Sequence, residues 1–372
     1  MKKRTLLLLF ACTAALAFSA CGKEEAEETP AADAAPEPVI QVISEDSSAP
    51  AIEEETEVVE EETREGMYRS ELTNEWIDES LKDQRPIAVM VDNEKTALPH
   101  FGLSKSDVIY EITNSTAGGG VTRLMVLVKD WGNIEQLGSI RSVRPTNLQI
   151  IPEWNAVICH DGGPFYIDDY LARDYVENFS GTFSRVNNGK SREFTEYILP
   201  GDLDKNFDNK GYSRTYNEYY PGPHYKFSSE ENQIDLSSDS TAVNATHIQM
   251  PYKHNKPYLD YKDGLYYYSE YGSQHVDAGN NNEPLTFKNL LLQNARYVVF
   301  DDHGYMMFHS IDYNREGYYI TNGKAIKITW SKSEELSPTR YYDMDGNEIT
   351  LNTGRTYVAL VPDDIWSDLE IE

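Results

Sequence analysis

Three arginines and two glycines in the first half of the chain are the residues best suited to hold an anion. Arg141 and Arg144 stand within the segment Gly-Ser-Ile-Arg-Ser-Val-Arg-Pro, and Arg123 lies upstream of it. Gly119 and Gly120 end a run of three glycines shortly before Arg123. Guanidinium forks match phosphate or carboxylate oxygens, and glycines let backbone N–H groups approach an anion closely. The pattern therefore predicts an anion-binding site.

Carboxylates in the same half of the chain offer these arginines internal partners. Asp92 follows a predicted strand, and Asp107 and Glu111 lie at or within the next one. If these carboxylates pair with the arginines, the arginines are structural. If the arginines instead hold an anionic substrate, Asp92 belongs to the same polar site and Asp107 can assist the chemistry.

A His-Asp-Gly-Gly segment follows another predicted strand and precedes a predicted helix, a common place for functional loops in α/β folds. His160 and Asp161 could move a proton there. One histidine beside one carboxylate is a poor metal signature, because zinc takes three or four protein ligands and the remaining histidines show no ligand spacing. No phosphate-binding P-loop or Gly-x-Ser-x-Gly elbow is present. We therefore expect neither a metal nor another cofactor.

The first 21 residues have the order of a bacterial export signal. A basic start is followed by an apolar run over 6–18 and then by Ser-Ala-Cys. Cys21 after small residues resembles a lipobox, at which the signal is cleaved and the thiol receives diacylglycerol. This predicts a signal peptide over 1–20 and a lipid anchor on the extracytoplasmic face of the cell membrane. The alternative is ordinary cleavage near Ala20, without lipid.

The charge of the chain is concentrated after this cysteine. The net charge is −29, and residues 21–66 contain 16 acidic side chains against two basic ones, with almost no aromatic residues. Such a segment cannot bury enough apolar surface to fold, so we expect a disordered acidic stalk. The absence of a basic stripe excludes nucleic acid as a partner. Cys159 is the one cysteine outside the first 21 residues, so no internal disulfide framework is expected, and it reads as a small core residue.

Residues 67–225 mix predicted strands with predicted helices. The continuous apolar run at 87–91 favours a strand buried on both faces. The expected strands are 87–91, 107–112, 121–128 and 156–159. The expected helices are 70–81, 146–154 and 164–173. The pattern predicts an N-terminal α/β-like domain with a mixed sheet.

The chain changes character after a polar, turn-rich linker at 226–242. From 243 to 362, short strand-like runs alternate with Asp-Gly and Asn-Gly pairs, which accept the positive φ angles of tight hairpins. This predicts a mostly antiparallel β domain, followed by an acidic tail at 363–372. The fold class expected for the whole chain is therefore α+β.

Several segments resemble one family. Arg-Pro-Ile-Ala-Val-Met-Val-Asp-Asn from Arg85, the segment from Gly102 to Glu111, and the arginine segment described above resemble the YerB-like lipoproteins of Gram-positive bacteria. Their core is a domain of unknown function, DUF3048. The segments from Asn322 to Lys332 and 345–356 look like its C-terminal part. The resemblance implies a two-part extracytoplasmic lipoprotein and implies no established activity.

The chain departs from this family at two places. After the Phe-x-Arg element that Phe183-Ser-Arg resembles, the family typically has Pro-His-Asn, where this chain has Arg-Glu-Phe-Thr-Glu-Tyr at 192–197. Pro164 replaces a small residue after the Gly-Gly pair. If those positions served a reaction, this protein lacks it. A shorter likeness, around Ser-Ile-Arg141, is to the LytR-CpsA-Psr ligases of cell-wall glycopolymers, which hold polyprenyl pyrophosphate with arginines.

These observations favour a membrane-anchored binding module of the cell envelope. Its partner would be an anionic cell-wall or lipid-linked ligand, or another envelope protein. The alternative is an enzyme that acts on a phosphate-containing envelope substrate, with the arginines holding it and Asp107 or His160 assisting. The two hypotheses differ in whether the arginines converge on an open pocket beside a free acid or base.

Overall fold

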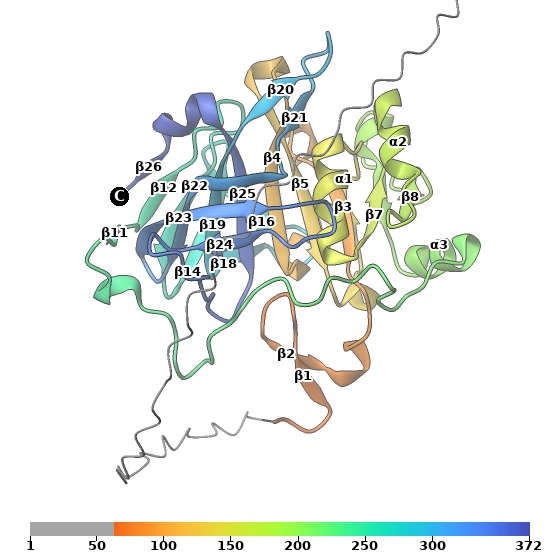
Figure 1. Ribbon diagram of the computed structural model, residues 1–372. Coiled ribbons are helices and arrows are strands. Elements are labelled where there is room, and N and C mark those ends of the chain that lie inside the picture. Colours follow the sequence, from red (N-terminus) through yellow and green to blue (C-terminus); the bar gives the residue numbers. More distant parts are fainter. Residues whose placement is uncertain (1–62) are drawn as a thin grey trace, which may run out of the picture. The chain divides into compact units, whose positions relative to one another are not determined.

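The computed structural model describes residues 63–372. The predicted signal peptide, Cys21 and the acidic segment as far as residue 62 lie outside the described residues. At the centre of the described part is a mixed sheet of 11 strands (Figure 1). In spatial order its strands are β11 (Val243–Asn244), β23 (Lys324–Lys332), β22 (Asp312–Thr321), β19 (Asn289–Ala295), β25 (Thr356–Pro362), β4 (Val108–Ser115), β5 (Val121–Val128), β3 (Ile87–Asp92), β7 (Val157–His160) and β8 (Asn178–Ser180), with β24 (Arg340–Tyr342) also paired to β23.

The large sheet combines strands from both halves of the chain. β25 pairs in parallel with β4 on one side and with β19 on the other. β3, β7 and β8 are also parallel to one another, whereas β5 is antiparallel to both β3 and β4. β3, β4, β7, β8, β25 and β19 therefore all point the same way, and their carboxyl ends lie at one edge of the sheet.

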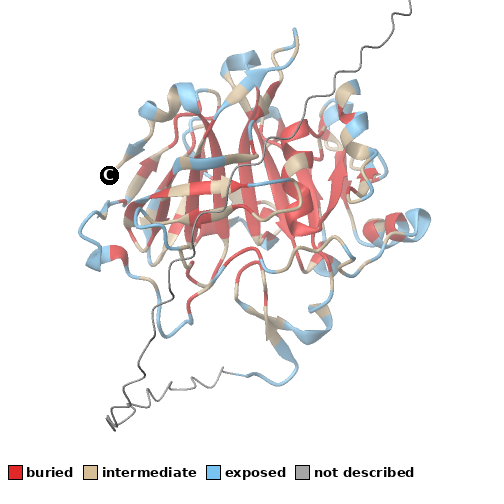
Figure 2. Cartoon of the chain, viewed as in Figure 1, coloured by how far each residue is buried: buried red, intermediate tan, exposed pale blue. Residues whose placement is uncertain are grey.

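Both faces of the central strands are buried, as their continuous apolar runs predict (Figure 2). Along β3, Val89 packs into one hydrophobic cluster and Met90 into the other, because successive side chains point to opposite faces. The first cluster includes Tyr266 from a second sheet. The second includes Leu148 from helix α1 (Pro145–Ile150). The sheet is therefore the middle layer between another sheet and a helical layer.

The second sheet has six antiparallel strands, all from the C-terminal half. They are β15 (Ser273–Gln274), β14 (Leu265–Glu270), β13 (Tyr258–Lys262), β12 (His247–Gln249), β26 (Glu370–Ile371) and β18 (Thr286–Phe287). Few helices with a mixed sheet in the N-terminal part, and mostly antiparallel strands in the C-terminal part, confirm the predicted α+β class. Residues 363–368, predicted as part of an acidic tail, form a 3₁₀ helix, and β26 follows them.

The remaining elements are short. The other strands are β1 (Met67–Arg69), β2 (Trp76–Asp78), β6 (Leu137–Gly138), β9 (Ser184–Arg185), β10 (Glu196–Ile198), β16 (Val276–Asp277), β17 (Glu283–Pro284), β20 (Tyr297–Val299) and β21 (Met306–Phe308). The other α-helices are α2 (Asp168–Leu171) and α3 (Asp202–Lys210). The 3₁₀ helices are η1 (Glu79–Leu81), η2 (Lys95–Ala97), η3 (Leu103–Lys105), η4 (Ala117–Gly119), η5 (Trp131–Asn133), η6 (Ile151–Trp154), η7 (Phe165–Ile167), η8 (Arg192–Phe194), η9 (Leu236–Ser238) and η10 (Asp363–Asp368).

The helix predicted over 70–81 is wrong. The segment forms a turn, the strand β2 paired with β1, and η1. Asn74 has a φ of 59°, which interrupts a right-handed helix. Trp76 does not lie in the core. The Arg69 guanidinium carbon lies over its ring, 4.2 Å from the centre of the Trp76 ring. Leu72 is buried, whereas Trp76 and Ile77 are only partly buried, so these apolar side chains do not form one buried helical face.

Candidate anion-binding site

Charged residues predicted to be functional lie at the edge where the parallel strands end, the upper edge of β4 and β5 in Figure 1. β3 ends at Asp92 and β7 ends at His160. β5 runs in the opposite direction, and its residue Arg123 pairs with Asp92 across the ladder, so Arg123 lies at the same edge. Ligands of open α/β sheets bind outside the carboxyl ends of the strands. A ligand-binding site is therefore expected at this edge.

Arg123 and Arg144 converge on one cavity. Arg144 immediately precedes α1, and both arginines are buried, with 7% and 5% of their surface exposed. They share the walls of a cavity of about 10 Å³, which has room for about one water molecule. Thr113 and Met306 line this cavity and also line a larger neighbouring pocket of about 250 Å³. The two arginines thus lie beside a pocket large enough for a small ligand group.

The predicted glycines belong to the larger pocket. Gly119 and Gly120, from η4 and the turn after it, line it together with Lys253. Their φ angles are 84° and 92°, a left-handed conformation that favours glycine, although a side chain at Gly119 would meet only open space. Asp364 is a carboxylate in the same wall, and it accepts a hydrogen bond of 3.0 Å from the Tyr297 hydroxyl. Glycines and arginines therefore line adjoining spaces.

Arg123 has neutral partners. Its Nη1 donates to Asn114 Oδ1 at 3.1 Å and to the Ser142 carbonyl at 2.6 Å. Its Nε is buried without a partner, and no carboxylate of residues 63–372 forms an ion pair with it. Burial, together with the positive charge of Arg144, lowers the pKa of Arg123 to about 9. A bound anion would offset both effects.

Arg144 is held in the same way. Its Nη1 donates to the Val143 carbonyl at 2.9 Å, and its guanidinium lies over the Tyr305 ring, 3.9 Å from the ring centre. Its Nε is also buried without a partner, and the described part of the chain supplies no carboxylate in ion-pair contact. Burial lowers its pKa. Buried charges are normally paired, so two adjacent unpaired guanidinium groups are an unusual and costly arrangement.

Arg141, the third predicted arginine, is already neutralised. Its Nε lies 2.6 Å from Asp92 Oδ2, and its Nη2 lies 2.9 Å from Glu193 Oε2. Arg141 is therefore paired with carboxylates of the described chain, whereas Arg123 and Arg144 are not.

The predicted acid–base residues at this edge have internal partners. The His160 ring lies within 2.8 Å of the Gly162 carbonyl oxygen through Nδ1 and faces Asn178 Oδ1 through Nε2. Burial lowers the pKa of His160. Asp161 accepts a hydrogen bond of 2.8 Å from Arg185. Burial would raise the pKa of Asp161, but this bond, the hydrogen bond with Glu196 and the charge of Arg185 together lower it. Neither side chain lines the cavity of Arg123 and Arg144.

Asp107 lies at the opposite edge of the sheet. It directly precedes β4, whereas Asn114 stands near the other end of that strand, about 23 Å away at 3.3 Å per residue. Asp107 Oδ2 accepts a hydrogen bond of 2.6 Å from the Lys129 backbone N–H. Burial raises the pKa of Asp107 to about 7, although that hydrogen bond lowers it. The structure thus does not bring Asp107 to the arginines.

We expect Asp107 to make the protein less stable as the pH rises from about 4 to about 7. The unfolded chain loses the Asp107 proton near its ordinary pKa of 3.8, whereas the folded chain keeps it until about pH 7. The cost to the free energy of unfolding is at most about 4 kcal/mol. Asp107→Asn should match the wild type near pH 4 and exceed its stability at pH 8, as measured by urea unfolding. An equal difference at both pH values would contradict this assignment.

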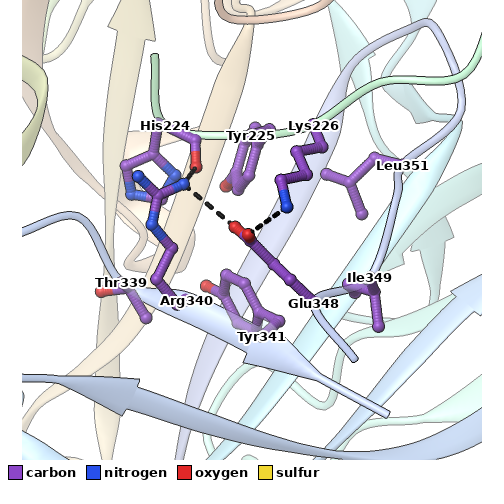
Figure 3. A pocket seen from close by; sticks show the side chains of 9 residues that line it. All are labelled: His224, Tyr225, Lys226, Thr339, Arg340, Tyr341, Glu348, Ile349 and Leu351. Atoms are coloured by element: carbon purple, nitrogen blue, oxygen red, sulfur yellow. Dashed lines mark hydrogen bonds and ion pairs between the residues drawn. The ribbon is translucent and has the colours of Figure 1, made fainter. Parts of the chain in front are cut away.

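A second hollow, beside His224, holds only about 10 Å³ (Figure 3). Its charged groups are satisfied from within, because Arg340 donates to Glu348 Oε1 at 3.1 Å and to the His224 carbonyl at 2.9 Å. Lys226 Nζ lies 2.5 Å from the other oxygen of Glu348. With so little space and paired charges, this hollow is a packing feature rather than a ligand site.

Two family models match this chain over most of its described length. The family description "Protein of unknown function (DUF3048) N-terminal domain" matches residues 72–213, and the corresponding C-terminal domain matches 248–358. The chain belongs to the DUF3048 family. This confirms the resemblance found in the sequence.

This DUF3048 protein is similar to a curated relative in sequence and to a solved structure in fold. It is 23% identical over 312 residues to "Putative lipoprotein YerB" of Bacillus subtilis (strain 168), which covers 79% of this chain and 86% of that protein. The crystal structure of the YerB protein from Bacillus subtilis superposes with a TM-score of 0.69 at 20% identity, over 82% of this chain and 99% of the other. This likeness shows a shared fold. Across residues 63–372, no helix of this DUF3048 protein is long and apolar enough to span a bilayer.

Proposed function

We propose that this protein is an extracytoplasmic lipoprotein, anchored through Cys21, that binds an anionic ligand of the cell envelope at Arg123 and Arg144. The observation that carries the proposal is the pair of buried arginines without a carboxylate partner in the described chain. The lipobox-like sequence and the similarity to a relative named as a lipoprotein support the anchor.

Phosphate or pyrophosphate is the anion that fits these groups best. Guanidinium forks bind phosphate oxygens through parallel N–H donors, and buried pairs of this kind are stronger than exposed ones. Lys253 in the neighbouring pocket adds a cation, and the backbone at Gly119 lies beside open space that a ligand could enter. Together these groups could hold a charged head group of more than one phosphate.

Exposed apolar side chains beside the arginines support a lipid-linked form of this ligand. Phe165 is 86% exposed and Phe300 is 45% exposed, and both rings contact Tyr166. Tyr305, which lies against Arg144, accepts a backbone hydrogen bond of 2.7 Å from Phe300. Clustered exposed apolar residues mark lipid or protein contacts. An acyl or polyprenyl chain could therefore lie on this patch while its phosphate reaches the arginines.

The candidate acid–base side chains already interact with partners within the protein, which favours binding over catalysis. Asp92 pairs with Arg141, and Asp161 pairs with Arg185, while His160 is held by a backbone carbonyl. A general base must reach the proton that it removes, and these side chains are directed at their partners. The enzymatic alternative would need a catalytic group other than those predicted.

Titration calorimetry of the full-length protein in detergent with sodium pyrophosphate tests the anion site. Arg144→Gln should weaken binding roughly 10- to 100-fold, because a hydrogen bond to a charged group contributes about 1.5–3 kcal/mol. Arg214→Gln is the matched control, because Arg214 is an exposed arginine that pairs with Asp204 and Asp208. The proposal fails if wild-type protein shows no binding, or if both variants weaken it equally.

Vesicles that carry polyprenyl phosphate distinguish a lipid-linked ligand from a free one. Phe165→Ser with Phe300→Ser should lower flotation with these vesicles and leave pyrophosphate binding unchanged. If the apolar double variant floats as well as the wild type, a soluble phosphate compound becomes the better ligand.

A further inference from the structure

Two histidines and a glutamate meet in another pocket, where His100 comes from a part of the chain far from Glu270 and His275. His100 follows η2, Glu270 ends β14, and His275 follows β15. His100 Nδ1 lies 2.9 Å from His275 Nε2, which lies 3.9 Å from Glu270 Oε1. The three atoms are all within 4.8 Å of one another. No metal is expected from the sequence, because His100 lies about 170 positions from the other two residues and no local ligand spacing points to it.

The hydrogen bonds leave ligand atoms available. His100 Nε2 lies 2.6 Å from the Asp92 carbonyl oxygen, which can only accept, so the ring donates there and His100 Nδ1 carries a lone pair. Glu270 Oε1 is buried and has no hydrogen-bond partner among residues 63–372. An unpartnered carboxylate oxygen beside two imidazole nitrogens is an arrangement that a cation would complete.

The surroundings give an ion room without exposing the ligands. A pocket of about 320 Å³ is lined by these three residues together with 98–99, 273–274 and 276. His100, Glu270 and His275 are 0%, 2% and 5% exposed. The ligand atoms are thus shielded from bulk water but border an open space.

We propose that His100 Nδ1, His275 Nε2 and Glu270 Oε1 bind one divalent transition-metal ion, with zinc the best match. Two imidazoles and a carboxylate are a zinc donor set, and sites with three protein ligands leave the fourth position for water or substrate. That position faces the pocket. In the metal-free protein the His275 Nε2–H donates to His100 Nδ1, and metal binding moves this proton to His275 Nδ1.

The geometry requires a small adjustment. Two nitrogens on a tetrahedral zinc, each about 2.0–2.1 Å from the metal, lie about 3.3–3.4 Å apart. The 2.9 Å separation of the ring nitrogens must therefore widen by about 0.4–0.5 Å. The bond from His100 to the Asp92 carbonyl is the kind of outer contact that orients a metal-binding histidine. Asp92 also pairs with Arg141, so one residue connects this pocket with the arginine edge.

Equilibrium dialysis of the chelator-treated full-length protein against Zn²⁺ tests the proposal. Wild-type protein should bind one Zn²⁺ per chain, and Co²⁺ in its place should give the strong visible absorption of four-coordinate cobalt. Glu270→Gln and His275→Gln should each weaken binding about 100-fold or more, because they remove direct ligands, whereas outer-contact changes cost about 10–100-fold. His303→Gln, which changes an exposed histidine, should leave binding unchanged.

The melting temperature of each variant without metal shows whether it folds. Glu270→Gln keeps the shape of the side chain, so it remains a valid test if His275→Gln does not fold. Failure of wild-type protein to bind Zn²⁺ would overturn the site, and so would unaltered binding by Glu270→Gln. The titration contains no phosphate ligand, so its outcome is separate from that of the anion proposal.

Discussion

A double variant with Arg123→Met and Arg144→Met is expected to lose pyrophosphate binding roughly 1,000-fold and yet to unfold no more easily than ligand-free wild-type protein. Each lost charged contact costs about 1.5–3 kcal/mol of binding free energy, which gives the thousandfold figure for two arginines. Stability should respond differently, because both guanidinium groups are buried without a carboxylate partner in the described chain. Removing an uncompensated buried charge relieves a cost of folding.

The gain in stability is limited by the hydrogen bonds that are lost. Arg123 donates hydrogen bonds to Asn114 Oδ1 and to the Ser142 carbonyl. In the Arg123→Met variant these acceptors would lose their donor and would need a water molecule in its place. We expect the free energy of unfolding to change by between zero and about +2 kcal/mol, as the two effects partly cancel. Urea unfolding without ligand measures it.

Arg85→Met is the matched control for this experiment. Arg85 is also fully buried, but it forms an ion pair with Glu177 and donates to the Asn155 carbonyl at 2.7 Å. Its removal leaves Glu177 without its cation, so we expect a loss of about 3 kcal/mol. If the double variant lost as much stability as Arg85→Met, Arg123 and Arg144 would be structural, and the anion site would lose its main support.

The parts of this fold that the sequence predicts are those with a local physical cause. The run at 124–128 is apolar at every position because this part of β5 is buried on both faces. Asn322 and Gly323 have φ angles of 50° and 74°, so the tight turn between β22 and β23 is set by those two residues. The helix expected over 70–81 does not form. Periodicity in the sequence cannot show whether the fold provides an apolar surface for such a helix to pack against.

The candidate site was predictable only in part, for the same reason. Arg123 and Arg144 could be found because each lies close to the end of a predicted element. Tyr305 and Lys253 reach the site from the C-terminal half, and no local signal points to them. The sequence predicts Arg141 as an anion-binding residue with Asp92 as an alternative internal partner, but its second partner, Glu193, lies about 50 positions away, where no local signal points to it.

The pairing of both halves in one sheet leads to the second large effect, which we expect from Lys332→Met. Lys332 Nζ, on β23, lies 3.0 Å from Glu153 Oε2, on η6, and both side chains are 0% exposed. Burial alone would raise the pKa of Glu153, but the charges and hydrogen bonds of Lys332 and His224 together outweigh it and hold the pKa at about 2. Removing the lysine leaves a buried carboxylate without its cation, at a cost of about 3–5 kcal/mol in the free energy of unfolding.

Urea unfolding of four proteins isolates this interaction: wild type, Lys332→Met, Glu153→Gln, and the double variant. The double variant should recover most of the loss, because a neutral amide beside a methionine leaves no charge unpaired. The Thr339 N–H, which donates to Glu153 at 2.8 Å, can also donate to the amide oxygen. A loss below 1 kcal/mol for Lys332→Met would mean that water reaches Glu153. A single transition in all four proteins would indicate that the halves joined by this ion pair unfold together.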